Sequence, residues 1–150
     1  MPKLMKSINN ISRCQAAYRT AKVVGTPAEG LSPCYHAIII AVCKYPGRSQ
    51  EELARELCLD KSTITRALSH LEDNGFVVRE PNLNDKRSLL VYPTEKMKNA
   101  LPTVRAISAE WNRLISAEIS EEEFEVFCSV LYRLEDGAKG VIKDMERRRG

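Results

Sequence analysis

Residues 49–88 constrain the fold of this chain more than any other stretch, because their capping and turn residues divide them into short elements. Ser49 and Glu52 form the pattern Ser-x-x-Glu, a capping box in which each side chain satisfies a free backbone N–H at a helix start. Asp60 is a second N-cap candidate only three residues after Leu57, so the connection must be very short. The sequence therefore predicts two helices joined by a tight turn.

The second of these helices has one apolar side and one polar side. Ile64, Leu68 and Leu71 fall on one face at helical spacing, and Gly75 ends the helix because glycine readily adopts the left-handed conformation. The outward side is predicted to present small hydrogen-bonding side chains and cations: Lys61, Ser62, Thr63, Thr65, Arg66, Ser69 and His70. Two short helices meeting at a tight angle are a helix-turn-helix.

A β-hairpin is predicted directly after this unit. Residues 76–78 and 89–92 are β-rich, and the polar stretch 81–87 between them predicts a loop too long for a two-residue turn. A helix-turn-helix followed at once by a hairpin is a winged helix. Near the tip of the wing the sequence places a carboxylate, two cations and a hydroxyl: Asp85, Lys86, Arg87 and Ser88.

Helical patterns flank the winged unit on both sides. Residues 7–24 repeat apolar side chains at helical spacing, and Ser32 with Pro33 is predicted to begin the next helix as an N-cap and a first-turn proline. After the wing, Thr94 is predicted to cap a fifth helix that runs to about residue 118. Pro102 lies inside it and should either kink the helix or divide it in two.

The last helix is predicted to begin at the capping box of Ser120 and Glu123. Its apolar positions alternate steps of three and four residues: Phe124, Phe127, Leu131, Leu134, Ala138, Val141 and Met145. This seam is longer than the small winged lobe could cover. It is therefore predicted to pack against another long helix, either in the chain or in a second copy.

The composition fits one soluble unit of mixed structure. The chain has 150 residues, 43% of them hydrophobic, and a net charge of +3, which permits nucleic-acid binding without requiring it. Five cysteines without a Cys-x-x-Cys pair favour a reducing compartment, and the longest apolar run, 37–43, is too short to span a membrane. We expect a cytoplasmic protein that is mainly α with a small β-hairpin wing (α+β).

The order of these parts resembles the MarR family of winged helix-turn-helix transcription regulators, over nearly the whole chain. The strings that carry the resemblance are Leu31-Ser32-Pro33, Leu53-Ala54, Leu59 to Arg66, Leu71-Glu72, Gly75 to Arg79, Asp85 to Ser88, Thr94-Glu95-Lys96 and Ser120 to Glu123. Within a single MarR-type domain, 1–150, the resemblance implies a DNA-binding lobe at 31–93 and a helical dimerisation lobe at 1–30 and 94–150. Met97, where the family often has glycine, and a short loop between the first two helices depart from the pattern.

The resemblance implies a homodimeric, sequence-specific regulator of double-stranded DNA, expected to be a repressor that binds an inverted-repeat operator. Arg66 is then predicted to contact guanine in the major groove, and Arg87 to enter the minor groove while Asp85 braces it or a neighbouring cation. The alternatives are a solvated Arg66 paired with a nearby carboxylate and a surface ion pair in the wing. For His70, DNA contact and plain exposure remain equally open.

Regulation is expected through a small aromatic or apolar ligand, or through an oxidant. Cys14 is either a reactive sensor or, as we favour, a buried structural cysteine. An effector pocket would be lined by Tyr18, Tyr35, His36, Met97 and Trp111, each of which could instead pack in a core. The sequence has no pattern typical of an enzyme, a metal site or a cofactor site. The alternative function is a winged-helix module for protein–protein interaction, which should expose apolar or acidic residues on the face that here carries Ser62, Thr63, Thr65 and Arg66.

Overall fold

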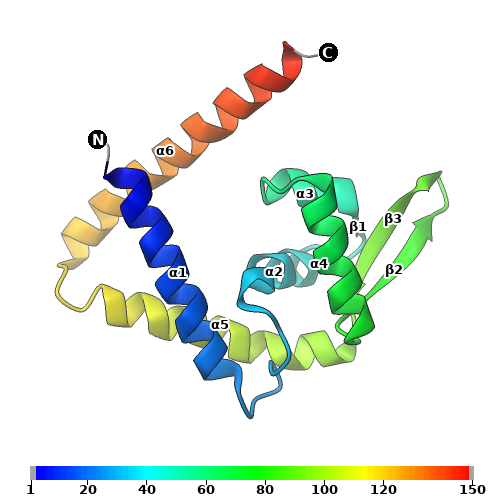
Figure 1. The fold of residues 1–150 in the computed structure, drawn as a ribbon, viewed down its shortest axis with the longest axis horizontal. Helices are drawn as coiled ribbons and strands as arrows, with labels where there is room; N and C mark the ends of the chain where they lie inside the picture. The colour runs from blue at the N-terminus through cyan, green and yellow to red at the C-terminus, as the bar shows by residue number, and fades with distance from the viewer. Residues whose placement is uncertain (1–2, 149–150) are drawn as a thin grey trace. The chain divides into compact units, whose positions relative to one another are not determined.

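A computed structural model describes residues 3–148. In chain order the elements are α1 (Leu4–Val23), a short 3-10 helix η1 (Pro33–Tyr35), α2 (His36–Lys44), β1 (Arg48–Ser49), α3 (Gln50–Glu56), α4 (Lys61–Asp73), β2 (Val77–Asn82), β3 (Asp85–Pro93), α5 (Glu95–Ile115) and α6 (Glu121–Arg147) (Figure 1). The chain forms two compact units, which divide between Trp111 and Asn112. The prediction of a mainly helical fold with a small β wing is confirmed.

The sheet has three antiparallel strands in the order β1-β3-β2, and β2 with β3 forms the wing. The last pair of the hairpin joins Asn82 to Asp85, so only Leu83 and Asn84 form the turn. The predicted long loop over 81–87 is therefore wrong. Pro81 pairs with Leu89 on an edge strand, where a residue without a backbone N–H is tolerated.

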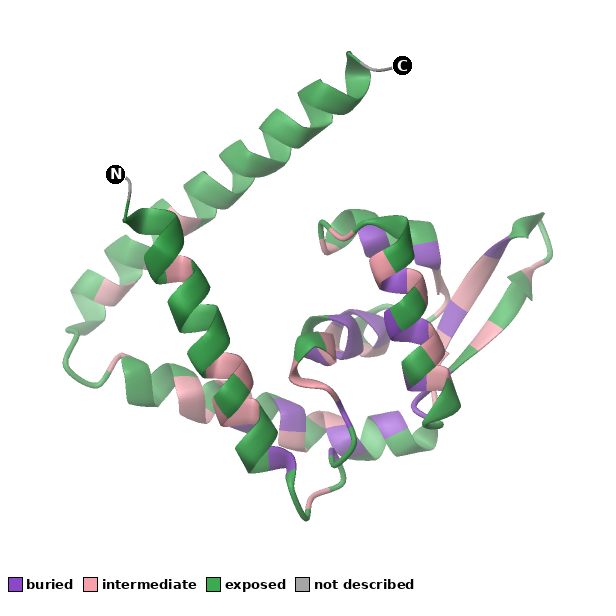
Figure 2. Ribbon diagram, in the orientation of Figure 1, coloured by how far each residue is buried: buried purple, intermediate pink, exposed green. Residues whose placement is uncertain are grey.

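The core of the first unit lies between α2, α4, α5 and the sheet, as the buried residues in Figure 2 show. Ile64, Leu68 and Leu71 of α4 are almost completely buried, as predicted. Ile39 of α2 and Phe76 before β2 belong to the same cluster. Burying a side chain of this size stabilises the fold by ~1.5–3 kcal/mol, so this core fixes α4 firmly in the lobe.

The helix starts predicted within the winged unit are confirmed. The Ser49 hydroxyl accepts the N–H of Glu52 at 3.2 Å, and Glu52 accepts the N–H of Ser49 at 2.8 Å. Asp60 caps α4, and Gly75 has a φ of 74° just beyond the end of that helix. These local signals set the short connection between α3 and α4.

The start of α2 differs from the prediction. Ser32 makes no side-chain cap hydrogen bond; its carbonyl accepts the N–H of Tyr35 at 2.9 Å, which closes a 3-10 turn. Pro33 begins that turn, and the α-helix itself begins at His36.

α5 continues through Pro102. Of the two outcomes predicted for this proline, a kink or a division, the division is therefore wrong. Thr94 caps it, since its hydroxyl accepts the N–H of Met97 at 3.2 Å. Ala100 and Val104 flank the proline and are completely buried, whereas Pro102 itself is exposed. Packing on both sides of the proline holds the helix together despite the missing backbone hydrogen bond.

The second unit consists of the end of α5 and α6. The predicted capping box is confirmed, because Ser120 and Glu123 exchange hydrogen bonds of 3.2 and 3.0 Å. No described residue of α6 is buried, and Phe127, Leu134 and Val141 of the apolar seam are 54%, 47% and 60% exposed. Most of the seam is thus exposed among residues 3–148. Among residues 3–148, no helix is long and apolar enough to cross a membrane.

Candidate nucleic-acid interface

The first turn of α4 is organised around Asp60. Its carboxylate accepts the hydroxyls of Ser62 and Thr63 at 2.7 and 2.6 Å, and the backbone N–H of Thr63 at 2.7 Å. These hydrogen bonds hold the pKa of Asp60 well below its usual range. The hydroxyl hydrogens of Ser62 and Thr63 are thus committed to Asp60, while their oxygen lone pairs remain able to accept.

Lys61 and Arg66 are the free cations of this helix. The Thr65 hydroxyl donates to the carbonyl of Lys61 at 2.7 Å, so Thr65 also has its donor in use. Both cationic side chains are exposed, and neither makes a hydrogen bond or ion pair with any other residue in the range 3–148. The alternative in which Arg66 pairs with a nearby carboxylate therefore does not occur in this structure.

The later part of the predicted outward face points to neighbouring protein groups. The Ser69 hydroxyl accepts a hydrogen bond of 3.2 Å from Arg79. The His70 ring lies 5.4 Å from the Tyr35 ring, between ring centroids, and its Nε2 is 3.5 Å from the Asn74 amide nitrogen. Helical spacing alone places these residues on a face but does not reveal such partners, so the expected free outward hydroxyl of Ser69 is not observed.

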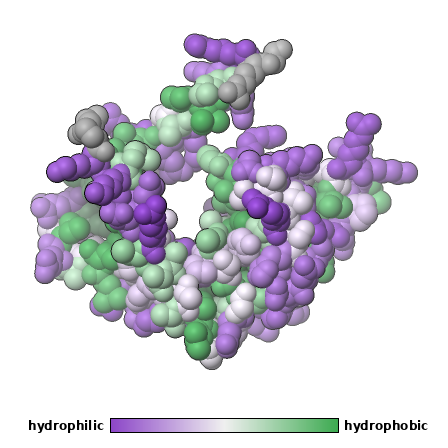
Figure 3. Space-filling model, viewed as in Figure 1, coloured by the Kyte–Doolittle hydropathy of each residue, from purple (hydrophilic) through white to green (hydrophobic). Residues whose placement is uncertain are grey.

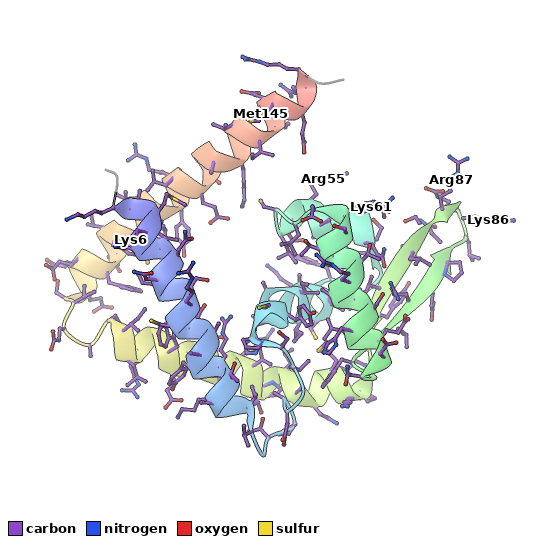
Figure 4. All side chains as sticks on the ribbon, in the orientation of Figure 1. Lys6, Arg55, Lys61, Lys86, Arg87 and Met145 are labelled. Atoms are coloured by element: carbon purple, nitrogen blue, oxygen red, sulfur yellow. The ribbon has the colours of Figure 1, made fainter. Side chains whose placement is uncertain are left out.

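The wing carries two further exposed cations, Lys86 and Arg87, next to its turn. Asp85 Oδ1 accepts the backbone N–H of Arg87 at 3.1 Å, and Asn82 Oδ1 accepts that of Asn84 at 3.0 Å. Asp85 therefore braces the backbone of the turn. The sequence had instead predicted that it would brace the guanidinium of Arg87 or a neighbouring cation. Lys86 and Arg87 are exposed and extend away from the tip (Figure 4).

Ser88 is turned away from the tip, in contrast to its predicted place on the DNA-binding surface. It is only 9% exposed, and its hydroxyl lies 3.5 Å from Glu51 Oε2 on α3. Because successive residues of a strand point to opposite faces, a one-residue step from Arg87 is enough to reverse the direction. Ser88 thus belongs to the contact between the wing and α3.

Arg55 is an exposed cation that the sequence analysis missed. It lies near the end of α3, on the same side of the helix pair as Lys61 (Figure 4). Figure 3 shows mainly hydrophilic residues over the wing and the adjacent helices of this unit. A signal was available, because Leu53 and Ala54 are buried and helical spacing places Arg55 away from their face.

The comparisons with known proteins agree with this arrangement. A family model described as the MarR family matches residues 37–89, which run from α2 into β3. A crystal structure of a MarR transcriptional regulator from Methanosarcina mazei Go1 aligns with 93% of this chain and 99% of its own, with a TM-score of 0.81 and 27% identity. The chain belongs to the MarR family. It is a transcriptional regulator of that family.

Other MarR-family relatives extend over most of the chain. The HTH-type transcriptional regulator YybA of Bacillus subtilis (strain 168), itself uncharacterised, is 29% identical over 108 residues, 72% of this chain and 70% of its own. A MarR-family structure from Listeria monocytogenes, complexed with a 26mer DNA, has a TM-score of 0.83 at 23% identity and covers 93% of this chain and 91% of its own. The structure of PcaV from Streptomyces coelicolor with its natural ligand has a TM-score of 0.76 at 21% identity, and it covers 87% of this chain and 90% of its own.

The ring contacts of the expected effector residues of this MarR-family chain fall into two pairs. Tyr18 and Trp111 pair, with ring centroids 5.3 Å apart, whereas Tyr35 lies against His70. Met97 is fully buried in the core. An open hollow of about 430 Å³ lies elsewhere, lined by Tyr45, Arg48, Glu52, Arg55 and Glu56. Cys14 is exposed in the single chain, contrary to the structural reading that we favoured.

His36 is the most unusual of these residues. It is fully buried, and neither ring nitrogen has a hydrogen-bond partner among residues 3–148. Burial, together with the charge of Arg19, lowers the pKa of His36 to about 4. Arg19 itself donates to the Pro33 carbonyl at 3.5 Å and to the Ser108 hydroxyl at 3.4 Å. His36 is therefore a neutral polar group within an apolar environment.

Proposed function

We propose that this MarR-family regulator is a repressor that binds an inverted-repeat operator as a homodimer. One observation carries the proposal: Lys61 and Arg66 on α4, and Lys86 and Arg87 on the wing, are exposed cations of one lobe. A helix fits the major groove, and a wing with an arginine at its tip fits the adjacent minor groove. The Listeria relative with the same fold was crystallised with DNA, which supports this choice of partner.

The individual contacts follow from the donors that remain free. Arg66 would contact guanine by a bidentate hydrogen bond, and Lys61 and Lys86 would contact phosphates. Ser62 and Thr63 would accept hydrogen bonds from base amino groups while keeping their bonds to Asp60. Thr65 would accept in the same way while its hydroxyl still donates to the Lys61 carbonyl. Arg87 would enter the minor groove. His70 would contribute at most a flanking contact, because its ring already lies against Tyr35.

We propose that residues 31–93 form the DNA-binding lobe, and that 1–30 with 94–150 form the dimerisation lobe. The uncovered apolar seam of α6 supports a second copy of this chain as its partner, since exposed apolar faces of this length are typical of interfaces. A symmetric dimer would contact half-sites ~10 bp apart, centre to centre. Because its partner is DNA, we place the protein in the cytoplasm.

We propose further that a small aromatic or apolar effector regulates binding, in the region of Tyr18, His36 and Trp111. The Tyr18–Trp111 ring pair offers an aromatic surface, and the buried, unpartnered imidazole of His36 offers a polar group. PcaV, which shares the fold, was crystallised with its natural ligand. Oxidation of the exposed Cys14 is the second route by which such a dimer could be regulated.

The deciding experiment selects duplexes from a random-sequence pool and then titrates the enriched duplex at low and high salt. A sequence-specific regulator enriches an inverted repeat and loses affinity steeply as salt rises, because phosphate contacts release counterions. Absent or salt-insensitive binding would instead favour the protein–protein interaction module. In the same titration Lys61→Ala should weaken binding. Lys98→Ala, which removes a lysine from an exposed ion pair on α5, is its charge-matched control.

A further inference from the structure

Arg79, at the base of the wing, uses its charge entirely within the protein. Only 15% of its side chain is exposed. Its guanidinium donates from Nε and Nη2 to Glu72 Oε2 at 3.0 and 2.6 Å, from Nη1 to Gln50 Oε1 at 3.0 Å, and from Nη2 to Ser69 Oγ at 3.2 Å. Four of its five N–H donors therefore have partners.

These partners join three elements. Arg79 lies on β2, Gln50 is the first residue of α3, and Ser69 and Glu72 lie in the second half of α4. Glu72 also accepts the backbone N–H of Arg79, through Oε1 at 3.0 Å. Because β2 is an edge strand, its outer N–H groups lack a strand partner, and Glu72 supplies one. Glu72 thus holds both the backbone and the side chain of Arg79.

Because its guanidinium is paired with Glu72, Arg79 is not available to contact a DNA phosphate. The hydrogen bonds from Arg79 lower the pKa of Glu72, so the carboxylate is ionised and balances the guanidinium. A contact between Arg79 and a phosphate would require these bonds to break. The arginine that ends the Gly75 to Arg79 motif therefore has a role other than direct DNA contact.

Besides the Arg79 network, the described residues join the wing to the rest of the lobe by the packing of Val77 and Val91 in the core and by few hydrogen bonds. β1 pairs with β3 only at Leu90 and Val91, so the strands nearer the turn pair only with each other. The hydrogen bond from the Ser88 hydroxyl to Glu51 Oε2 also joins the wing to α3, but it is long, at 3.5 Å. A two-stranded ribbon is marginally stable and twists readily, so its direction depends on the contacts at its base.

We propose that Arg79 is a positioning residue for DNA binding. Through Glu72, Gln50 and Ser69 it holds the wing at a fixed angle to α4, so that Arg66 and Arg87 reach adjacent grooves together. The proposal rests on the proposed DNA-binding function. α4 itself is held by its buried apolar face, so loss of Arg79 frees the wing without displacing α4.

A double-mutant cycle tests this coupling, with the duplex that the wild-type protein enriches from a random-sequence pool as the probe. In the wild-type background, Arg87→Ala weakens binding by about 10- to 100-fold. In the Arg79→Met background the same change weakens binding less than about 3-fold, because the wing is no longer held in its groove. Arg66→Ala costs the same factor in both backgrounds.

Two results would overturn the proposal. One is an unchanged Arg87→Ala factor in the Arg79→Met background. The other is a matching collapse of the Arg66→Ala factor, which would show that the network supports the whole lobe rather than the wing. If the pool yields no enriched duplex, the proposed DNA-binding function fails before the cycle begins.

Further variants keep the test valid if Arg79→Met does not fold, which thermal unfolding by circular dichroism reveals. Arg79→Lys retains the charge but cannot bridge Glu72, Gln50 and Ser69 at once, and Glu72→Gln removes the carboxylate charge. Both reduce the Arg87→Ala factor. An unchanged Arg87→Ala factor in both variants contradicts the proposal. Glu95→Gln neutralises a carboxylate in the exposed pair with Lys98 and leaves the factor unchanged.

Discussion

The hydroxyl of Thr63 donates to the carboxylate of Asp60 at 2.6 Å, within the first turn of α4. The same carboxylate accepts the Thr63 backbone N–H and the Ser62 hydroxyl. One side chain therefore caps the helix and orients two of the residues proposed to contact DNA. Asp60 therefore contributes both to the stability of α4 and to the orientation of the proposed DNA-contacting residues, although its own charge repels phosphate.

Replacing Asp60 with alanine should lower the thermal unfolding midpoint by a few degrees, because the cap and its favourable charge at the helix N-terminus are lost. Asp73→Ala is the matched control: it removes the same charge at the other end of α4, where a carboxylate is unfavourable, and should not destabilise. Melting curves that ranked the two variants the other way would contradict the capping role.

The low pKa of Asp60 adds a pH dependence to this comparison. A carboxyl whose pKa is lower in the folded state contributes stability above its unfolded pKa of about 3.9. That contribution is lost as the pH falls below this value. The difference between the wild type and Asp60→Ala should therefore shrink upon acidification below about pH 4, and a constant difference would rule out the ionised cap.

Arg66 and Arg87 should affect DNA binding in different ways. Each alanine variant should cost ~1–3 kcal/mol of binding to the selected duplex, and Arg66→Ala should also relax the preference at one base position. Lys86→Ala should weaken all duplexes alike and reduce the salt slope by about 1. Arg105→Ala, an exposed charge change on α5, is the control for all three.

Fluorescence anisotropy on a panel of single-base variants of the duplex distinguishes these roles. The base assignment would be wrong if Arg66→Ala lowered the affinity for every duplex by one common factor. The wing assignment would be wrong if Arg87→Ala bound as tightly as the Arg105→Ala control.

Leu134→Asp should convert a dimer into a monomer. Leu134 lies in the middle of the α6 seam and is 47% exposed in the single chain, so a carboxylate there would be buried only on dimerisation. Ser129→Asp introduces the same residue on α6 outside the seam and should leave the dimer intact. Sedimentation equilibrium gives the masses, and a dimeric Leu134→Asp variant would exclude the seam as the interface.

The sequence predicts what depends on neighbouring residues in the chain. The capping boxes at Ser49 and Ser120, and the cap at Asp60, are local hydrogen bonds between residues two or three apart, so their spacing is sufficient to identify them. The wing turn was predicted wrongly because Pro81 and its polar neighbours have a loop-like composition. Their pairing is decided by their place on an edge strand, which only the sheet topology reveals.

The candidate site shows the same limit. Lys61, Arg66, Lys86 and Arg87 are exposed as expected, since long cations seldom lie in a core. The partners of Ser69 and Ser88 could not be predicted, because Arg79 and Glu51 lie 10 and 37 positions away along the chain. The continuity of α5 through Pro102 could not be predicted either, because it depends on packing against distant residues.

His36 should make the protein less stable in mild acid. Its pKa is about 4 in the folded protein, mainly because of burial, against about 6.5 when unfolded. The unfolded state therefore binds a proton more readily between these values, and folding stability falls as the pH decreases from 6.5 to 4. The integrated loss is of order 3 kcal/mol, which follows from ~1.4 kcal/mol for each pKa unit.

Urea unfolding at pH 7 and pH 5 measures the part of this loss that occurs above pH 5, ~2 kcal/mol. His36→Leu removes the titrating group and should flatten the dependence, since an apolar side chain also suits the buried position. His70→Leu is the matched control on the exposed side of α4 and should retain the wild-type slope. An equally steep slope in His36→Leu would show that other groups, such as carboxylates, account for the acid sensitivity.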